Sequence, residues 1–222
     1  MYRERGLDKT RILCYTVLLT QTVPFMAIDT RKDLFNVLFP NEPAFRWRQI
    51  EAAFFNVVSG WEGVTTLSKS MRETLAEKMP WMSVQQAEIY ESNQHDTWKV
   101  VLEATDGKQF ESVFMSNRQG DWTICVSSQV GCAMRCTFCA TGTMGLKRSL
   151  TLDEIVDQYR FWQQWLRDHT ELSGRISNVV FMGMGEPMAN YENVKNAILT
   201  WLRHTDLGPT KITVSTVGIL PQ

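Results

Sequence analysis

Long hydrophobic runs are missing from this sequence of 222 residues. Apolar stretches such as VVFM and AAFF are short, whereas a helix that crosses a membrane needs roughly 18 or more residues. Charge imbalance is missing too, because 23 Lys and Arg stand against 24 Asp and Glu. Composition therefore excludes a membrane protein and gives no strongly basic field for a nucleic acid, although a local basic surface stays open. We expect an ordinary globular chain of one or two domains.

Cysteine is sparse, odd in number and clustered. Four of the five cysteines lie between residues 125 and 139; the full set is Cys14, Cys125, Cys132, Cys136 and Cys139. This spacing argues against a disulfide framework and favours metal or thiol chemistry in a reduced compartment. We therefore expect a cytoplasmic protein.

Residues 1–29 superficially resemble a secretory signal, because basic residues precede the apolar stretch ILCYTVLLT. Thr16 and Thr20 interrupt that stretch, no small-residue cleavage site follows, and Met26 opens a more ordinary start. We interpret this segment as a leader or as an over-extended gene start.

The segment from Pro43 to Gly60 predicts a helix, since Ile50, Phe54, Val57 and Val58 share one helical face. A second helix is expected over 68–79, before Pro80. Basic residues of this helical module are candidates for phosphate contacts, although a solvated helix face is the commoner explanation. They are Arg46, Arg48, Lys69, Arg72 and Lys78.

The hydrophobic period then changes to two. Trp98, Val100 and Leu102 alternate with more polar neighbours, Asp106-Gly107 predicts a hairpin turn, and KQFESVFM continues the ladder. The next run, DWTICVSSQVG, is expected to be one strand that leads into the cysteine cluster.

Strands and helices alternate beyond the cluster. The sequence Thr-Leu-Asp-Glu at 151–154 is a capping box that starts a helix to about His169. SNVVFMGMG predicts a strand, 191–204 a helix, and KITVSTVG a third strand. This order is typical of a parallel βα array, as a sheet or a barrel.

The three cysteines Cys132, Cys136 and Cys139 have the spacing C-x-x-x-C-x-x-C. Three thiolates on one loop can each bind one iron of a cubane cluster, and because most electron-transfer clusters use four cysteines, one iron stays open. The alternative is zinc, which needs a fourth ligand. The histidines lack a zinc-site spacing and are expected on surfaces or at helix ends; they are His95, His169 and His204.

Three motifs, CVSSQVGCAMRCTFCATGTMG, FMGMGEP and ITVSTVG, resemble the RlmN/Cfr family of radical-SAM RNA methyltransferases, and most closely its RlmN branch. The likeness runs from about residue 30 to the end. It implies an α/β fold: the N-terminal half of a partial (β/α)6 radical-SAM barrel over 96–222, preceded by a small helical and β-hairpin accessory domain over 30–95 that grips RNA by shape.

The resemblance also implies a cofactor site. Cys132, Cys136 and Cys139 match the ligands of a [4Fe-4S] cluster whose open iron binds S-adenosylmethionine. The GMGEP motif matches the segment that holds the methionine part, where glycines let backbone approach and a carboxylate accepts from the ammonium group. Its residues are Gly183, Gly185, Glu186 and Pro187, and Ser215 in the third strand matches a further S-adenosylmethionine contact.

Two further residues acquire catalytic roles only through the resemblance. Cys125 matches a cysteine that closes a transient disulfide with a methyl-carrying C-terminal cysteine; on its own, a half-buried strand cysteine is more often inert. Glu111 matches the proposed proton acceptor with a one-residue offset in the following loop, and a surface strand glutamate is the alternative.

The implied enzyme is a 23S ribosomal RNA and transfer RNA adenine-C2 methyltransferase. One S-adenosylmethionine methylates the carrier cysteine, and a second generates the radical that activates this methyl group. The adenine must leave its stack to reach the cluster. An electron donor such as flavodoxin and a monomeric state are also expected. Two other classes stay open: a different radical-SAM enzyme, and a non-catalytic iron–sulfur or zinc-binding fragment.

The methyl-carrier cysteine is absent, since no cysteine follows Cys139. A βαβ unit takes about 30 residues, so six units need roughly 180, whereas 101 residues run from Trp122 to the end. We therefore expect a truncated gene product that does not transfer a methyl group by itself.

Overall fold

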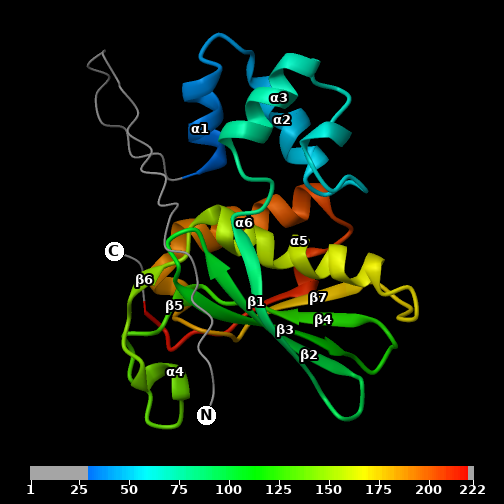
Figure 1. Cartoon of the computed structure of the whole chain (residues 1–222). Coiled ribbons are helices and arrows are strands. Elements are labelled where there is room, and N and C mark those ends of the chain that lie inside the picture. Colours follow the sequence, from blue (N-terminus) through cyan, green and yellow to red (C-terminus); the bar gives the residue numbers. More distant parts are fainter. Residues whose placement is uncertain (1–29, 220–222) are drawn as a thin grey trace, which may run out of the picture.

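The structure, a computed structural model, describes residues 30–219 (Figure 1). The expected leader over 1–29, and Cys14 within it, lie outside this range. None of the described helices is long and apolar enough to cross a membrane.

The described chain begins with a helical module. It comprises α1 (Arg31–Leu38), α2 (Ala44–Ala53), the 3-10 turn η1 (Trp61–Gly63) and α3 (Lys69–Lys78). Side chains at the expected positions cap two of the helices: Thr30 forms a capping box with Asp33, and Ser68 accepts from the Met71 N–H. The predicted helix over 68–79 is thus confirmed.

The helix predicted to run to Gly60 is too long. The structure ends α2 at Ala53, and the next turns bond three residues back, from the Phe55 N–H to the Ala52 carbonyl. The Phe54 carbonyl accepts instead from Arg160 Nε at 3.0 Å. Tertiary contacts therefore override the helical period, and the Val57 side chain is 86% exposed.

A six-stranded mixed sheet follows, in the order β1-β2-β3-β4-β7-β8. The first four strands run antiparallel to their neighbours, with the predicted turn at Asp106-Gly107 between β2 and β3, whereas β4, β7 and β8 are parallel. The expected domain boundary at residue 95 falls inside the β1–β2 hairpin. The strands are β1 (Val84–Glu91), β2 (Thr97–Ala104), β3 (Gln109–Ser116), β4 (Trp122–Cys125), β7 (Ile176–Phe181) and β8 (Ile212–Val214).

Two helices connect the parallel strands. The capping box of Thr151 and Glu154 starts α5 (Leu152–Asp168), and α6 (Tyr191–His204) has the predicted bounds. Figure 1 shows both helices on one face of the sheet, between the sheet and the α1–α3 module. The predicted parallel βα array is confirmed.

Stacked aromatic rings join α5 to the sheet. The Phe114 ring lies 4.3 Å from the Trp122 ring and 5.1 Å from the Trp162 ring, nearly parallel to both. The Trp162 Nε1–H donates to Ser112 Oγ at 2.9 Å, so its polar group stays paired while its side chain is fully buried. This packing fixes which face of the sheet is covered.

A buried ion cluster joins the helical module to α5. The fully buried Asp157 carboxylate accepts from Arg31 Nη2 at 2.9 Å, from Arg160 Nη1 and from the Ser83 N–H at 2.6 Å. The guanidinium groups of Arg31, in α1, and Arg160, in α5, each lie 4.4 Å from the centre of the Phe54 ring. The cluster thus holds α1, α2, the 81–83 connection and α5 together.

Charge pairing sets the protonation of this cluster. Burial disfavours the charged carboxylate, but Arg160 and Arg31 outweigh it and hold the pKa of Asp157 at about 2. Burial lowers the pKa of Arg160 to about 10. Both groups are therefore charged near neutral pH, and each depends on the other because water does not solvate them.

Replacing Asp157 by Asn leaves two buried guanidinium groups without their shared counter-charge. We expect Asp157→Asn to lower the free energy of unfolding by about 3 kcal/mol at pH 7, measured by urea denaturation. The pKa of Asp157 is lowered on folding, so its stabilisation is present above the unfolded value of about 3.9 and is lost as the pH falls toward 2. The gap between wild type and variant therefore closes between pH 5 and about 2.

Asp206→Asn is the matched control, because Asp206 pairs with Arg175 at an exposed position. An exposed ion pair contributes about 0–1 kcal/mol, so this variant stays close to wild type. A loss at Asp157 no larger than that at Asp206, or one independent of pH, contradicts the assignment.

Candidate functional site

Cys132, Cys136 and Cys139 lie on one loop, and the two ends of this loop run close together and form a narrow neck. A two-residue ladder of β5 (Gln129–Val130) and β6 (Arg148–Ser149) closes the neck. Gly131 has φ +76°, and a Cβ placed there meets the Gly145 carbonyl oxygen at 1.9 Å. Only glycine allows the two ends of the loop to approach so closely. The single strand predicted over DWTICVSSQVG is wrong, since β4 ends at Cys125 and β5 belongs to a second sheet.

Arg148 fastens this neck to its surroundings. Its guanidinium pairs with Asp106 in the β2–β3 turn at 2.8 Å and with Glu154 in the α5 capping box at 2.7 Å. The ion pair with Arg148 is the main reason that the pKa of Asp106 is lowered. The cysteine loop is therefore anchored to both the hairpin and α5.

The three cysteines have the chemistry of thiolate ligands. Cys132 is buried and accepts from the Met134 N–H at 3.5 Å, whereas Cys136 and Cys139 are half-buried. A hydrogen bond from the Gly142 N–H lowers the pKa of Cys139, which favours its thiolate. A cavity of about 480 Å³ opens along the loop between Arg135 and Gly145.

A single metal ion does not fit this arrangement. Within residues 30–219, no three His, Cys, Asp or Glu side chains are grouped so that they could hold one ion. As predicted, the histidines lie on a surface or at helix ends, where His95 contacts Glu91, His169 ends α5 and His204 contacts Glu51. A cubane cluster places each thiolate on a different iron, so it needs no such tight group. Three cysteines on one loop have the donor chemistry for such a cluster.

The GMGEP segment lies against the residues that precede the cysteine loop. A Cβ on Gly183 meets Ser127 Oγ at 2.7 Å, and a Cβ on Gly185, at φ +101°, meets Gln129 Cβ at 2.6 Å. Hydrogen bonds run both ways, from the Ser128 N–H to the Met184 carbonyl at 2.8 Å and from the Glu186 N–H to Gln129 Oε1 at 3.0 Å. The two glycines are needed for this contact between segments.

The Glu186 side chain is 3% exposed and is bonded by its own chain. It caps η2 (Pro187–Asn190) by accepting from the Met188 N–H at 2.9 Å, and it accepts from Thr216 Oγ1 at 2.6 Å and the Val217 N–H at 2.9 Å. Ser215 was expected inside the third strand, but β8 ends at Val214 and Ser215 is the next residue, exposed, with its N–H 3.3 Å from the Phe181 carbonyl. Within residues 30–219, β8 lies at the edge of the sheet and pairs with β7 alone.

Cys125 and Glu111 share the sheet face opposite α5. Cys125 lies directly across from Val113, two residues from Glu111, whereas Phe114, which packs on α5, lies across from Ile124. Glu111 pairs with Lys99 Nζ at 2.9 Å, and its carbonyl accepts from Ser127 Oγ at 2.6 Å. Burial raises the pKa of the Cys125 thiol. All four described cysteines are free thiols.

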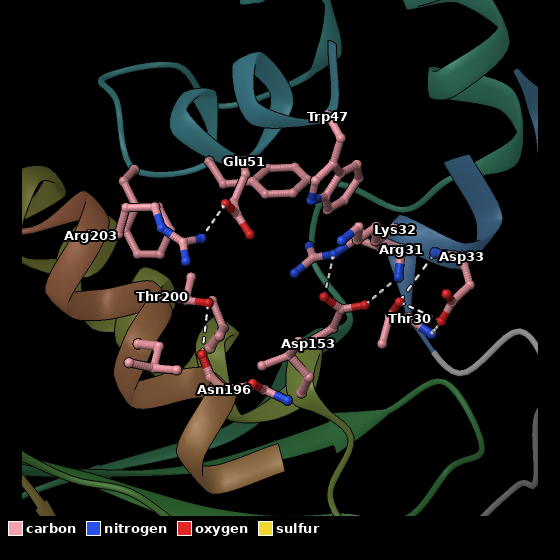
Figure 2. Close-up of a pocket in the computed structure, with 15 residues that line it drawn as sticks. Thr30, Arg31, Lys32, Asp33, Trp47, Glu51, Asp153, Asn196, Thr200 and Arg203 are labelled. Atoms are coloured by element: carbon pink, nitrogen blue, oxygen red, sulfur yellow. Dashed lines mark hydrogen bonds and ion pairs between the residues drawn. The ribbon is translucent and has the colours of Figure 1, made fainter. Parts of the chain in front are cut away.

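A separate cavity of about 370 Å³ lies between the helical module and α5 and α6 (Figure 2). None of the predicted site residues lines it. Several of its charged groups pair among themselves, as in Arg203 with Glu51 at 3.0 Å and Arg31 with Asp153 at 3.2 Å. Lys32 also lines the cavity and, within residues 30–219, forms no ion pair, so one cationic group there has no counter-charge.

The basic residues of the module are mostly engaged by neighbours. Arg46 pairs with Glu42, Lys69 with Glu73, and Arg72 donates to the Glu62 carbonyl. Within the described residues, Arg48 and Lys78 alone of the five have neither an ion pair nor a side-chain hydrogen bond. Three of the five basic side chains thus have partners within the chain, and their expected role in phosphate contacts stays a prediction.

Several supporting residues were missed from the sequence. Buried polar side chains join the motifs, among them Ser127, whose N–H donates to Gln158 Oε1 at 2.7 Å, and Asn190, which donates to the Ser128 and Leu150 carbonyls. In the sequence, the polar run Ser127-Ser128-Gln129 between apolar residues could have indicated this network, because buried polar side chains need hydrogen-bond partners.

This geometry, three cysteines on a loop after the first of three parallel strands, defines a radical SAM domain, and residues 126–222 match the radical SAM superfamily. The chain is 40% identical over 188 residues to a probable dual-specificity RNA methyltransferase RlmN of Chlorobium phaeobacteroides, with 81% of this chain and 51% of that protein covered. The corresponding Aquifex aeolicus protein is 42% identical over 180 residues, with 80% and 48% covered.

A solved structure supports the same assignment. The crystal structure of a radical SAM methyltransferase from Sphaerobacter thermophilus matches with a TM-score of 0.74 and 33% identity, covering 88% of this chain and 58% of that one. The chain belongs to the RlmN family of radical SAM proteins. It spans about half the length of the curated relatives it matches. Family membership implies a [4Fe-4S] cluster and S-adenosylmethionine as cofactors.

The contact at Gly185 yields a stability prediction. Gly185→Ala must move Gln129, whereas Gly107→Ala, also at positive φ, meets nothing within 4 Å. We expect Gly185→Ala to lower the free energy of unfolding by about 2 kcal/mol more than Gly107→Ala, measured by urea denaturation. Equal losses contradict the requirement for a close contact, because left-handed strain is common to both positions.

Proposed function

We propose that this chain forms the cluster- and cofactor-binding part of a radical SAM methyltransferase that acts on RNA. The observation that carries the proposal is that residues 126–129, which lead into the loop of Cys132, Cys136 and Cys139, lie against the GMGEP segment at the end of the parallel strands, where such barrels build their sites. The relatives that match most of this chain are named as RNA methyltransferases.

The cysteine loop holds the cluster in this proposal. When bound, the cluster would supply one electron, and S-adenosylmethionine a sulfonium that can be cleaved, for radical chemistry. The Cβ directions of Gly183 and Gly185 are filled by Ser127 and Gln129. In this proposal the exposed backbone at Gly183 contacts the methionine part, and the exposed Ser215 makes a further contact with S-adenosylmethionine. A carboxylate has about four acceptor positions, and three on Glu186 are used by its own chain, which leaves one for an ammonium group.

In this proposal, Glu111 and Cys125 take part in the steps that involve the RNA substrate. Glu111 lies on the face of the sheet opposite α5, with Lys99 as its ion-pair partner, and takes the proton from the adenine carbon. Cys125, on the same face, is the thiol that forms the transient disulfide with the methyl carrier. That carrier is not among the cysteines of this sequence.

The substrate in this proposal is an adenosine of 23S ribosomal RNA, and also of transfer RNA, methylated at C2. The dual-specificity name of the relatives supports the two RNA classes. An sp2 ring carbon of adenine is not nucleophilic, which is why radical chemistry serves here. Because this sequence holds no methyl-carrier cysteine, the test uses RNA modified by a longer protein that contains both this sequence and the carrier: 2-methyladenosine in that RNA supports the proposal, and 8-methyladenosine contradicts it.

Iron content tests the cluster assignment. Anaerobic reconstitution of this chain with iron and sulfide is expected to give about four irons per chain. Alanine at Cys132, Cys136 or Cys139 removes most of this iron, because an iron loses its protein ligand.

Cys125→Ala is the control, because Cys125 lies in β4 outside the loop. We expect it to keep wild-type iron content and, with a reductant, to form 5′-deoxyadenosine from S-adenosylmethionine. Iron loss at Cys125 equal to that at the loop cysteines refutes the assigned ligand set, and stoichiometric zinc in place of iron refutes the proposed function.

A further inference from the structure

Glu186 is a buried carboxylate held by neutral donors. Its three partners are the Met188 N–H, Thr216 Oγ1 and the Val217 N–H, at 2.9, 2.6 and 2.9 Å. No Lys, Arg or His of residues 30–219 forms an ion pair with it. A buried carboxylate without a counter-ion depends on its hydrogen bonds. Two of its three donors belong to residues that are exposed, Thr216 and Val217.

Two of the three donors come from the segment that follows β8. This strand has three residues at the sheet edge, and the bond from the Ser215 N–H to Phe181 is its last contact with β7. Beyond Ser215, the hydroxyl of Thr216 and the N–H of Val217 bind the two different oxygens of Glu186. The path of residues 216–217 is therefore set by the carboxylate, whereas Ser215 is still held by β7.

Thr216 has a second contact in the same turn. Its Oγ1 accepts from the Gly218 N–H at 3.0 Å while donating to Glu186. One hydroxyl thus joins the turn after β8 to the GMGEP segment after β7. A serine retains both bonds, whereas the nearly isosteric valine retains neither.

We propose that Thr216 is a positioning residue for the cofactor site: through Glu186 it holds Ser215 and the GMGEP backbone at the separation that S-adenosylmethionine needs. The inference rests on the proposed function, and it adds a residue that makes no contact with the cofactor itself. Its physical basis is preorganisation, since a site that is already ordered loses less entropy on binding.

The test compares Thr216→Val with Thr216→Ser and with Thr210→Val. Thr210 is exposed in η3 (Pro209–Lys211) and makes no side-chain hydrogen bond within the described residues, so it controls for the loss of a threonine hydroxyl. One readout is hydrogen exchange at the Val217 amide without cluster or cofactor. The other is equilibrium dialysis of S-adenosylmethionine with the reconstituted chain.

Thr216→Val is expected to bind S-adenosylmethionine about tenfold more weakly and to exchange the Val217 amide faster, because it loses a hydrogen bond to a charged group. Thr216→Ser and Thr210→Val stay within about twofold of wild type. If wild type binds and Thr216→Val binds equally well, the inference is overturned. If wild type reconstitutes but does not bind, the proposed function fails, while the exchange data still decide whether Thr216 orders the turn. Should Thr216→Val not fold, Thr216→Ala takes its place.

Discussion

The close contact between residues 126–129 and 183–186 is the constraint on which the site depends. The two segments follow neighbouring parallel strands, and the Gly183 N–H donates to the Val126 carbonyl at 3.2 Å. Ser127 lies at the centre: its hydroxyl donates to the Glu111 carbonyl and accepts from the Met184 N–H at 2.8 Å. Three strands are thereby joined at one edge, and the cysteine loop, the GMGEP segment and Glu111 all extend from this junction.

The same junction is connected to the helical module through α5. Asp157 and Gln158 are adjacent in α5 and fully buried, but their side chains have partners in different parts of the molecule. Asp157 holds the arginine cluster of the module, while Gln158 Nε2 donates to the Ser127 carbonyl at 2.9 Å. A region expected to bind RNA and the edge expected to hold the cofactors therefore share one rigid helix.

Local signals were sufficient for much of the fold. The capping box at Thr151, the turn at Asp106-Gly107 and the helix over 191–204 depend on neighbours in sequence, and all three predictions are confirmed. The end of α2 and the partners of Glu186 were not predictable, because Arg160 and Thr216 lie far away in the chain. The cysteine spacing identified the chemistry of the loop, but the polar network that supports it is tertiary.

Residues 126–222, which match the radical SAM superfamily, contain both segments of the junction, 126–129 and 183–186. A match over about half of each curated relative places the cluster loop and the GMGEP segment inside the shared part. What the described residues provide is therefore a set of strand ends at which the GMGEP segment lies against residues 126–129, the segment that leads into the cysteine loop.

Electron paramagnetic resonance of the reduced, reconstituted chain tests this account most directly. An iron without a protein ligand can bind S-adenosylmethionine, so we predict an iron–sulfur signal whose spectrum changes when S-adenosylmethionine is added. A cluster signal that stays the same with and without S-adenosylmethionine would contradict the account, because it would show that the cluster formed by Cys132, Cys136 and Cys139 has no iron open to the cofactor.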